Sequence, residues 1–112
     1  MDFARSVRGE VVVLAFRGSI RPEDNDLFAE ALSRVVSEGH RRVVLDARDL
    51  EYANSRAIGQ LVAFTREIRV LNGRVALVRP CERLTKLLMA VGLMSLVPSC
   101  GSLDGAVEAA AQ

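Results

Sequence analysis

A single serine, Ser55, lies between Asn54 and Arg56 in the stretch LEYANSRAIGQLVAF, residues 50–64, whose other residues are mostly apolar. A serine hydroxyl can serve as a nucleophile, accept a phosphoryl group, or cap a helix, and its neighbours decide which chemistry is available. The next three residues are Ala57, Ile58 and Gly59, which carry no group that could activate a nucleophile. Ser55 therefore has three candidate roles.

Nucleophilic catalysis is the least supported of these roles. Serine hydrolysis needs a general base and an oxyanion site, and no G-x-S-x-G elbow surrounds Ser55. His40 is the only histidine, and it precedes Arg41 and Arg42 where a solvated turn is expected. Neither G-x-x-x-x-G-K-[ST] nor G-x-G-x-x-G occurs, so no nucleotide cofactor is expected. We predict that the protein is not an enzyme.

The composition excludes several classes of partner. The formal net charge is +1, aromatic residues make up 4% and tryptophan is absent, which argues against direct binding of nucleic acid. Cys81 and Cys100 lack a C-x-x-C pattern, so reduced thiols are expected rather than a metal site or a disulfide. The start, MDFARSVRGE, does not resemble a signal peptide, and no apolar run could span a bilayer. We expect a cytoplasmic protein without membrane insertion.

Alternating elements are predicted to position Ser55. An apolar, β-branched run at 11–18 predicts a buried strand, and Arg8-Gly9-Glu10 can join it to a first strand near Phe3–Val7 in a hairpin. Further short apolar runs predict strands at 41–50 and 74–80, with a brief strand at Leu96-Val97. Helices are predicted at 22–39, 55–71, 81–93 and 103–111.

The spacing of apolar residues also predicts which helix faces are buried. The helix at 22–39 should end at Gly39, the next at Asn72-Gly73, and the third at Gly92, with Leu93 folding back over its last turn. The stripe of the third helix is expected to be core, with a partner surface as the alternative. The expected inner residues are Leu27, Phe28, Ala31, Leu32, Val35 and Val36; Ile58, Leu61, Val62, Thr65, Ile68 and Leu71; and Leu84, Leu87, Leu88 and Val91.

This order predicts one α/β domain covering residues 1–112. Its central sheet is mixed but mostly parallel, starts with a β-hairpin, and is flanked by about four helices. Functional crevices in such sheets lie at the carboxyl ends of strands, where strand-to-helix loops expose helix N-termini. The loop at 48–55, directly before the second helix, has that position.

Two roles for Ser55 remain at this helix start. Asn54 or Ser55 can be the N-cap, which is the ordinary use of these residues. The same free N–H groups favour a phosphate, so phosphorylation of Ser55 would be tolerated, and Arg56 and Arg48 could pair with it. Ala57 and Gly59 could admit a partner closely or pack against the sheet.

The segments LDARDLEYANSRAIGQLVAF, residues 45–64, and NGRVALVRPCERLTKLLMAVGL, residues 72–93, resemble the STAS domain of anti-sigma factor antagonists. The stretches VVVLAFRGSI at 11–20 and AVGLMSLVP at 90–98 extend the resemblance over nearly the whole chain. It implies a regulatory protein whose partner is both a kinase and an anti-sigma factor. That partner phosphorylates the serine matching Ser55, only the unphosphorylated form captures it, and a phosphatase resets the cycle.

The same resemblance implies a contact surface, made by Asn54, Ser55, Arg56, Ala57, Ile58 and Gly59. Three residues depart from the family pattern: Asn54 replaces an acidic residue, Arg56 a second hydroxyl residue, and Ala57 a glycine. An alternative therefore stays open, in which the domain is an unphosphorylated scaffold or a subunit of a larger complex, of the stress-signalling or lipid-transport type.

Overall fold

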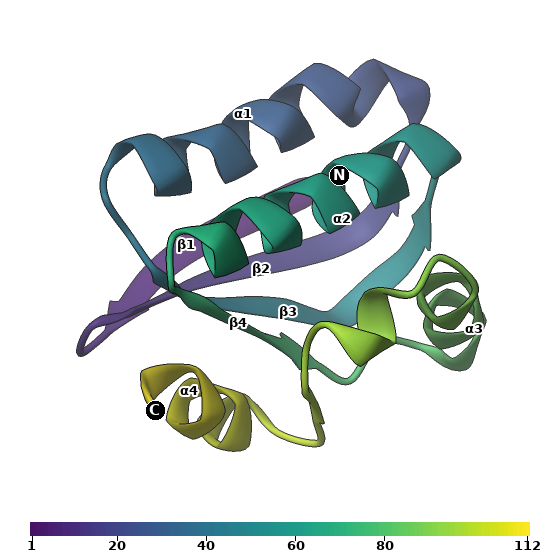
Figure 1. Ribbon diagram of the computed structural model, residues 1–112. Helices are drawn as coiled ribbons and strands as arrows, with labels where there is room; N and C mark the ends of the chain where they lie inside the picture. Colours follow the sequence, from purple (N-terminus) through teal and green to yellow (C-terminus); the bar gives the residue numbers. More distant parts are fainter.

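The computed structural model describes residues 1–112 and contains one five-stranded sheet with four α-helices (Figure 1). The strands are β1 Asp2–Arg8, β2 Val11–Ile20, β3 Arg42–Ala53, β4 Arg74–Val78 and β5 Ser99–Cys100. The α-helices are α1 Asn25–Ser37, α2 Ser55–Val70, α3 Glu82–Ala90 and α4 Leu103–Ala111, with 3-10 turns at Pro22–Asp24 and Leu93–Ser95. None of the helices combines the length and apolar character needed to cross a membrane.

The sheet has the strand order β1-β2-β3-β4-β5. β1 and β2 form an antiparallel hairpin closed by Arg8 and Val11, and β2, β3, β4 and β5 run parallel. Gly9 in the hairpin turn has φ +65°, a conformation that glycine adopts without strain. The predicted fold class, a mixed and mostly parallel sheet that begins with a hairpin, is confirmed.

Helices cover both faces of the sheet, which explains why its central strands are apolar on both sides. Alternate residues of β2 enter different clusters: Val12 and Leu14 join the larger cluster, to which α1, α2 and α3 contribute, while Val11 and Val13 pack with α4. In Figure 1, α4 accordingly lies across the sheet from α1 and α2. β3, which leads directly into Ser55, is therefore fixed between two layers.

The first predicted helix needs two corrections. Pro22–Asp24 form a 3-10 turn, and the α-helix starts only at Asn25. Leu27 is 46% exposed and does not belong to the inner face, which is formed by Phe28, Ala31, Leu32 and Val35. The predicted end is confirmed, because Gly39 has φ +87° directly after the last turn.

The predicted loop at 48–55 was wrong, because β3 continues to Ala53. β2 is also longer than predicted and pairs with this extension up to Ile20 opposite Ala53, with two register shifts along the way. Leu50 and Ala53 are buried, which ties the extension to the core. The predicted loop is thus reduced to Asn54.

The C-terminal third also departs from the prediction. α3 ends at Ala90, and Leu87 and Val91, predicted to be inner residues, are 39% and 46% exposed. Leu71, at the end of α2, is likewise 39% exposed. Gly92, with φ +81°, and the fully buried Leu93 lie as predicted. The last strand is Ser99–Cys100 rather than Leu96-Val97, since the 3-10 turn at Leu93–Ser95 delays pairing with β4.

Candidate functional site

Asn54 is the N-cap of α2. Its backbone is extended, with φ −72° and ψ 166°, and its Oδ1 accepts a hydrogen bond of 2.9 Å from the Ala57 N–H. This bond satisfies one of the donors that a helix start leaves without an acceptor. Of the two candidate caps, Asn54 therefore has the structural role and Ser55 does not.

The side-chain amide nitrogen of Asn54, Nδ2, joins the helix start to two other elements. It donates to the Ile20 carbonyl at 3.0 Å, where β2 ends, and to Asn25 Oδ1 at 2.9 Å, where α1 begins. Asn25 is only 7% exposed, so its side chain needs such a partner. The backbone N–H of Asn54 also donates to the Ile20 carbonyl, at 3.1 Å. A single side chain thus fixes β2, α1 and α2 at one point.

Ser55 is the first residue of α2 and is exposed. With Asn54 as the cap, the Ser55 hydroxyl has no capping role. The N–H groups of Ser55 and Arg56 start the helix and have no acceptor inside it. The positive end of the helix dipole is at the same place. The local field therefore favours a negative group on the Ser55 oxygen.

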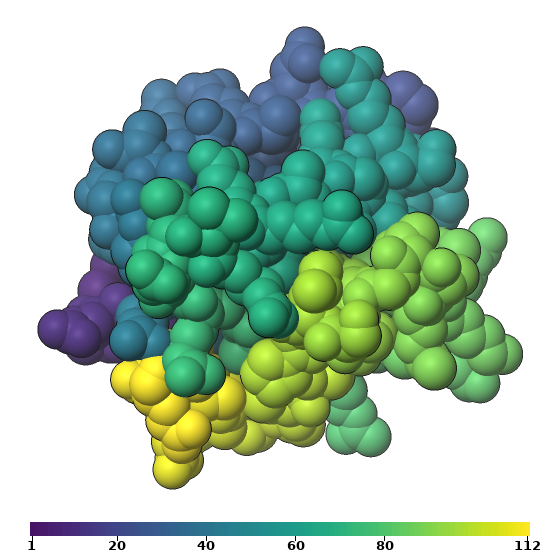
Figure 2. All heavy atoms as spheres, viewed as in Figure 1, coloured from purple at the N-terminus to yellow at the C-terminus, as the bar shows by residue number.

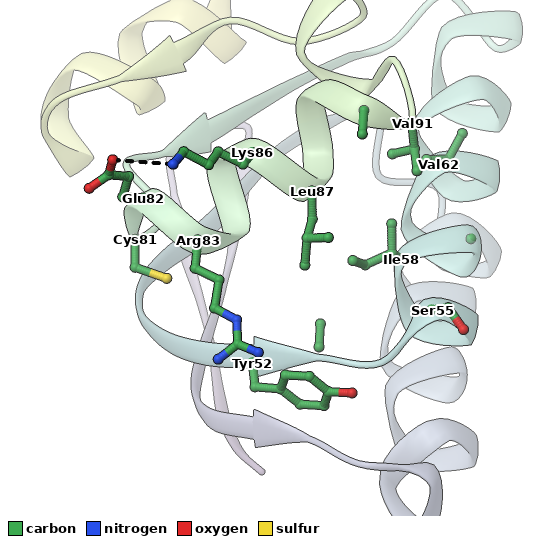
Figure 3. A pocket seen from close by; sticks show the side chains of 13 residues that line it. Tyr52, Ser55, Ile58, Val62, Cys81, Glu82, Arg83, Lys86, Leu87 and Val91 are labelled. Carbon is green, nitrogen blue, oxygen red and sulfur yellow. Dashed lines mark ion pairs between the residues drawn. The ribbon is translucent and has the colours of Figure 1, made fainter.

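Beside Ser55, an open groove of about 1220 Å³ runs between α2 and α3 (Figure 3). Ile58 and Leu87 face each other across it in Figure 3, from α2 and α3 respectively. The space-filling view places α2 and α3 next to one another at the surface (Figure 2). The lining residues are Tyr52, Ala53, Ser55, Ile58, Gly59, Val62, Cys81, Glu82, Arg83, Lys86, Leu87, Ala90 and Val91.

The groove combines an apolar lining with a polar rim. The Arg83 guanidinium lies over the Tyr52 ring, 5.9 Å from its centroid, which is within cation–π range. Lys86 and Glu82 form an ion pair of 3.7 Å one turn apart on α3. An exposed apolar surface with charged groups at its margin is typical of an interaction site.

Arg48 was expected to be able to pair with a phosphate on Ser55, but it binds another group. Its Nε and terminal nitrogen donate to the Asp46 carboxylate at 3.0 and 2.8 Å. These hydrogen bonds hold the pKa of Asp46 below its ordinary value and raise the pKa of Arg48. The extended strand also separates Arg48 from Ala53 by about 16 Å, at a rise of about 3.3 Å per residue. Arg56 remains the cation adjacent to Ser55.

The remaining predicted contact residues divide by burial. Arg56 and Gly59 are exposed, and Asn54 is half-buried. Ala57 is 1% exposed and packs inward, and the 6% exposed Ile58 reaches the surface only as part of the groove. A methyl group on Gly59 would meet no atom within 4 Å, so this glycine is not required for packing on the sheet.

The sequence offered the apolar stripe of α3, which includes Leu87, only as an alternative partner surface, and it did not place Arg83 and Lys86 beside Ser55. Arg83, Lys86 and Leu87 follow β4, and only the packing of α3 beside α2 brings them near Ser55. The signal available was the excess of apolar residues on α3. Cys81 also lines the groove; it and Cys100 are free thiols.

His40 is not the solvated turn residue that was predicted. Its ring is half-buried, and its Nε2 lies 2.9 Å from an Arg5 nitrogen and 3.8 Å from Glu38 Oε1. The cause is tertiary: β1 brings Arg5 over the turn after α1, where Glu38 binds it. His40 therefore belongs to the contact between β1 and α1, away from the groove.

Comparison with known proteins agrees with this architecture. The family described as "Mlab, STAS domain" matches residues 3–98. BtrV of Bordetella bronchiseptica, assigned as an anti-sigma factor antagonist, is 22% identical over 99 residues, which cover 88% of this chain and 85% of BtrV.

Solved structures show the same fold. A Thermotoga maritima protein, also assigned as an anti-sigma factor antagonist, matches with TM-score 0.89 and 23% identity over 98% of this chain and 95% of its own. The Bacillus cell fate determinant SpoIIAA in its phosphorylated form matches with TM-score 0.78 and 19% identity, covering 96% and 97%. The sheet order, the hairpin and the family match lead to one conclusion: this chain belongs to the STAS domain family, with the fold of the anti-sigma factor antagonists.

Proposed function

We propose that the protein is an anti-sigma factor antagonist, a non-enzymatic regulator that acts in the cytoplasm as the single domain 1–112. It binds a partner that is both kinase and anti-sigma factor, and phosphorylation of Ser55 by that partner ends the binding. A phosphatase restores the active form. The observation that carries this proposal is the position of Ser55: exposed, not used as the cap, and at the rim of an apolar groove.

Phosphorylation at this position changes the docking surface without changing the fold. A phosphoserine carries nearly two negative charges, and the first-turn N–H groups with the helix dipole stabilise it where it stands. The Asn54 hydrogen bonds to Ile20 and Asn25 do not involve Ser55 and can persist. A partner placed over the groove meets the new charge at its edge, where it must be desolvated or paired.

The test uses Ser55→Asp and Ser55→Ala as baits beside the wild-type protein, with extracts of the native host. We expect one ATP-binding partner to bind wild type and Ser55→Ala with affinities within about twofold. We expect Ser55→Asp to bind it at least about tenfold more weakly, as a misplaced charge at an interface does. The purified partner and ATP should then phosphorylate wild type at Ser55 but leave Ser55→Ala unmodified.

Ser33→Asp is the matched control, because Ser33 is also an exposed helix residue but lies on α1, away from the groove. It should bind like wild type. Equal binding by Ser55→Asp and wild type, together with an unmodified Ser55, contradicts the switch.

A second function is favoured by the family match, whose description names Mlab. In this alternative the domain is a constitutive subunit of a larger complex, of the lipid-transport or stress-signalling type. The replacement of the family's acidic residue by Asn54 and of its second hydroxyl residue by Arg56 fits such a role. Here all three Ser55 baits recover the same partners, while a charge in the groove, such as Leu87→Asp, abolishes recovery.

A further inference from the structure

The hairpin strand β1 is an open edge of the sheet. All seven residues of β1 are exposed, and β2 pairs with only one of its sides. The opposite edge of the sheet is β5, which has only two residues. A long open edge offers a row of free N–H and C=O groups for another strand. The residues on this edge therefore decide what can pair with it.

The hairpin geometry fixes which backbone groups are free. Arg8 and Val11 flank a two-residue turn, so they form the hydrogen-bonded pair that closes the hairpin. Hydrogen-bonded and non-hydrogen-bonded pairs alternate along an antiparallel ladder. Even-numbered residues of β1 therefore direct their N–H and C=O toward β2. Phe3, Arg5 and Val7 direct theirs outward.

We propose that β1 pairs antiparallel with β1 of a second copy of this chain, centred on Arg5, which joins two sheets into one continuous sheet. A two-fold axis at Arg5 places Phe3 of each copy opposite Val7 of the other, and the two Arg5 residues opposite each other. The outward N–H and C=O groups of these residues then face one another. The same axis sets Asp2 of each copy opposite Arg8 of the other. Every residue of the strand then has a partner.

The side chains are self-complementary in this register. Phe3 and Val7, which are 38% and 59% exposed, form two apolar pairs. Asp2 of each copy brings a carboxylate to Arg8 of the other, whose guanidinium is also bound at 2.7 Å by Asp104 of its own chain. The central Arg5 side chains are the one like-charged pair. Each is already bound by Glu38 of its own chain, which compensates the charge.

Other registers are worse. A shift by one residue places residues whose backbone N–H and C=O point outward opposite residues whose groups point toward their own β2. The hydrogen bonds between the two copies then cannot form. A shift by two residues shortens the overlap and sets Asp2 opposite Ser6, or Arg8 opposite Ala4. The sequence DFARSVR is thus matched to itself in one antiparallel register.

Sedimentation equilibrium of the intact protein tests the proposal. A lone strand pair buries less than a standard interface, so we expect a dissociation constant on the order of 100 µM. The weight-average mass should rise from 12.2 kDa toward twice that value as concentration increases. Val7→Lys should weaken the dimer at least about tenfold, because the symmetry removes both apolar pairs. Val70→Lys, at an 81% exposed site on α2, should not change it.

Cysteine cross-linking tests the register itself. Ala4 of one copy lies opposite Ser6 of the other in a non-hydrogen-bonded pair, whose Cα separation of about 4.5 Å suits a disulfide. In a background of Cys81→Ser and Cys100→Ser, mixing Ala4→Cys with Ser6→Cys should give a disulfide heterodimer under mild oxidation. Each variant alone should give much less.

Two outcomes overturn the proposal. One is a mass that stays at 12.2 kDa at hundreds of micromolar, with circular dichroism showing an intact fold. The other is a dimer that Val7→Lys leaves unchanged and in which the mixed cysteine variants cross-link no better than either alone. That result locates the dimer contact elsewhere on the molecule.

Discussion

Asn54 and Ser55 are adjacent, but only one of them belongs to the structural framework. Asn54 makes one capping bond and two donated bonds, to Ile20 and Asn25. Ser55 adds an exposed hydroxyl to the same helix start. This division allows Ser55 to be modified at small cost to the fold, because the cap does not depend on it.

Asn54→Ala should lower the free energy of unfolding by about 2 to 4 kcal/mol. The loss of the cap costs about 1 kcal/mol, and Asn25 Oδ1, left without its donor at a 7% exposed site, costs about 1 to 3 kcal/mol more. The Ile20 carbonyl keeps its hydrogen bond from the backbone N–H of residue 54. Ser102→Ala is the matched control, since Ser102 caps α4 through one bond of 3.1 Å to the Gly105 N–H. It should cost only about 1 kcal/mol. Urea denaturation measures both, and equal losses would contradict the anchoring role of Asn54.

The sequence could predict a cap at residues 54–55, but not which residue provides it. Asparagine and serine are equally good caps, so local preference does not separate them. The choice is made by Ile20 and Asn25, which lie 34 and 29 residues earlier in the chain. Asn54 can donate to these groups while its oxygen caps the helix. No pattern around Ser55 contains that information.

At the scale of elements, the predictions succeeded where an apolar run is covered on both sides and failed where cover is partial. β2 and β3 are central strands, and their apolar runs predicted them, although both continue further because they pair with each other. α3 contacts the core mainly through Leu84 and Leu88. Periodicity placed Leu87 and Val91 beside Leu84 and Leu88 on one face of the helix. It could not show that the buried strip of that face is too narrow to include Leu87 and Val91.

Gly59 in α2 and Gly73 in the turn after it should respond in opposite ways to substitution by alanine. Gly59→Ala should raise the free energy of unfolding by up to about 1 kcal/mol, since the added methyl meets open space and alanine favours helix. At Gly73 the added carbon would lie against the Arg41 carbonyl and 2.7 Å from Ile68 Cγ2. Gly73→Ala should therefore cost about 2 to 3 kcal/mol.

Thermal denaturation of these two variants checks the predicted changes in stability. The partner affinity of Gly59→Ala then tests separately whether a partner contacts α2 at Gly59. Because Gly59 lines the groove, Gly59→Ala should weaken partner binding while the protein becomes more stable. A stabilised variant with unchanged affinity would show that partners do not approach α2 at this point.

At the scale of the whole molecule, the two proposed surfaces are separate. β1 forms one edge of the sheet, while the groove lies between α2 and α3, beyond the carboxyl end of β3; the labels for β1 and α3 stand on opposite sides of Figure 1. A dimer joined through β1 therefore leaves both grooves open. It can hold two partners, or two sites of one dimeric partner, and the second attachment then benefits from a high effective concentration.

Acid should destabilise the molecule through carboxylates that the fold keeps ionised. The pKa of Asp46, 8% exposed on the central strand β3, is lowered by hydrogen bonds from Arg48, and that of Glu38 by a hydrogen bond from Arg5. A lowered folded-state pKa gives stability that is full above the unfolded value and is lost as the pH falls through the folded value.

Stability should therefore be nearly constant from about pH 7 to 5 and fall steadily below about pH 4.5, near and under the ordinary pKa values of these carboxyls. Asp46→Asn removes one contributor: it should cost up to about 1 kcal/mol at pH 7, and its difference from wild type should shrink as the pH falls through the lowered folded-state pKa of Asp46. Glu51→Gln, an exposed change on the same strand, should follow the wild-type curve. Urea midpoints measured across this range decide the matter, because a pH-independent gap between Asp46→Asn and wild type would mean that lost packing, and not the ionised pair with Arg48, sets the cost.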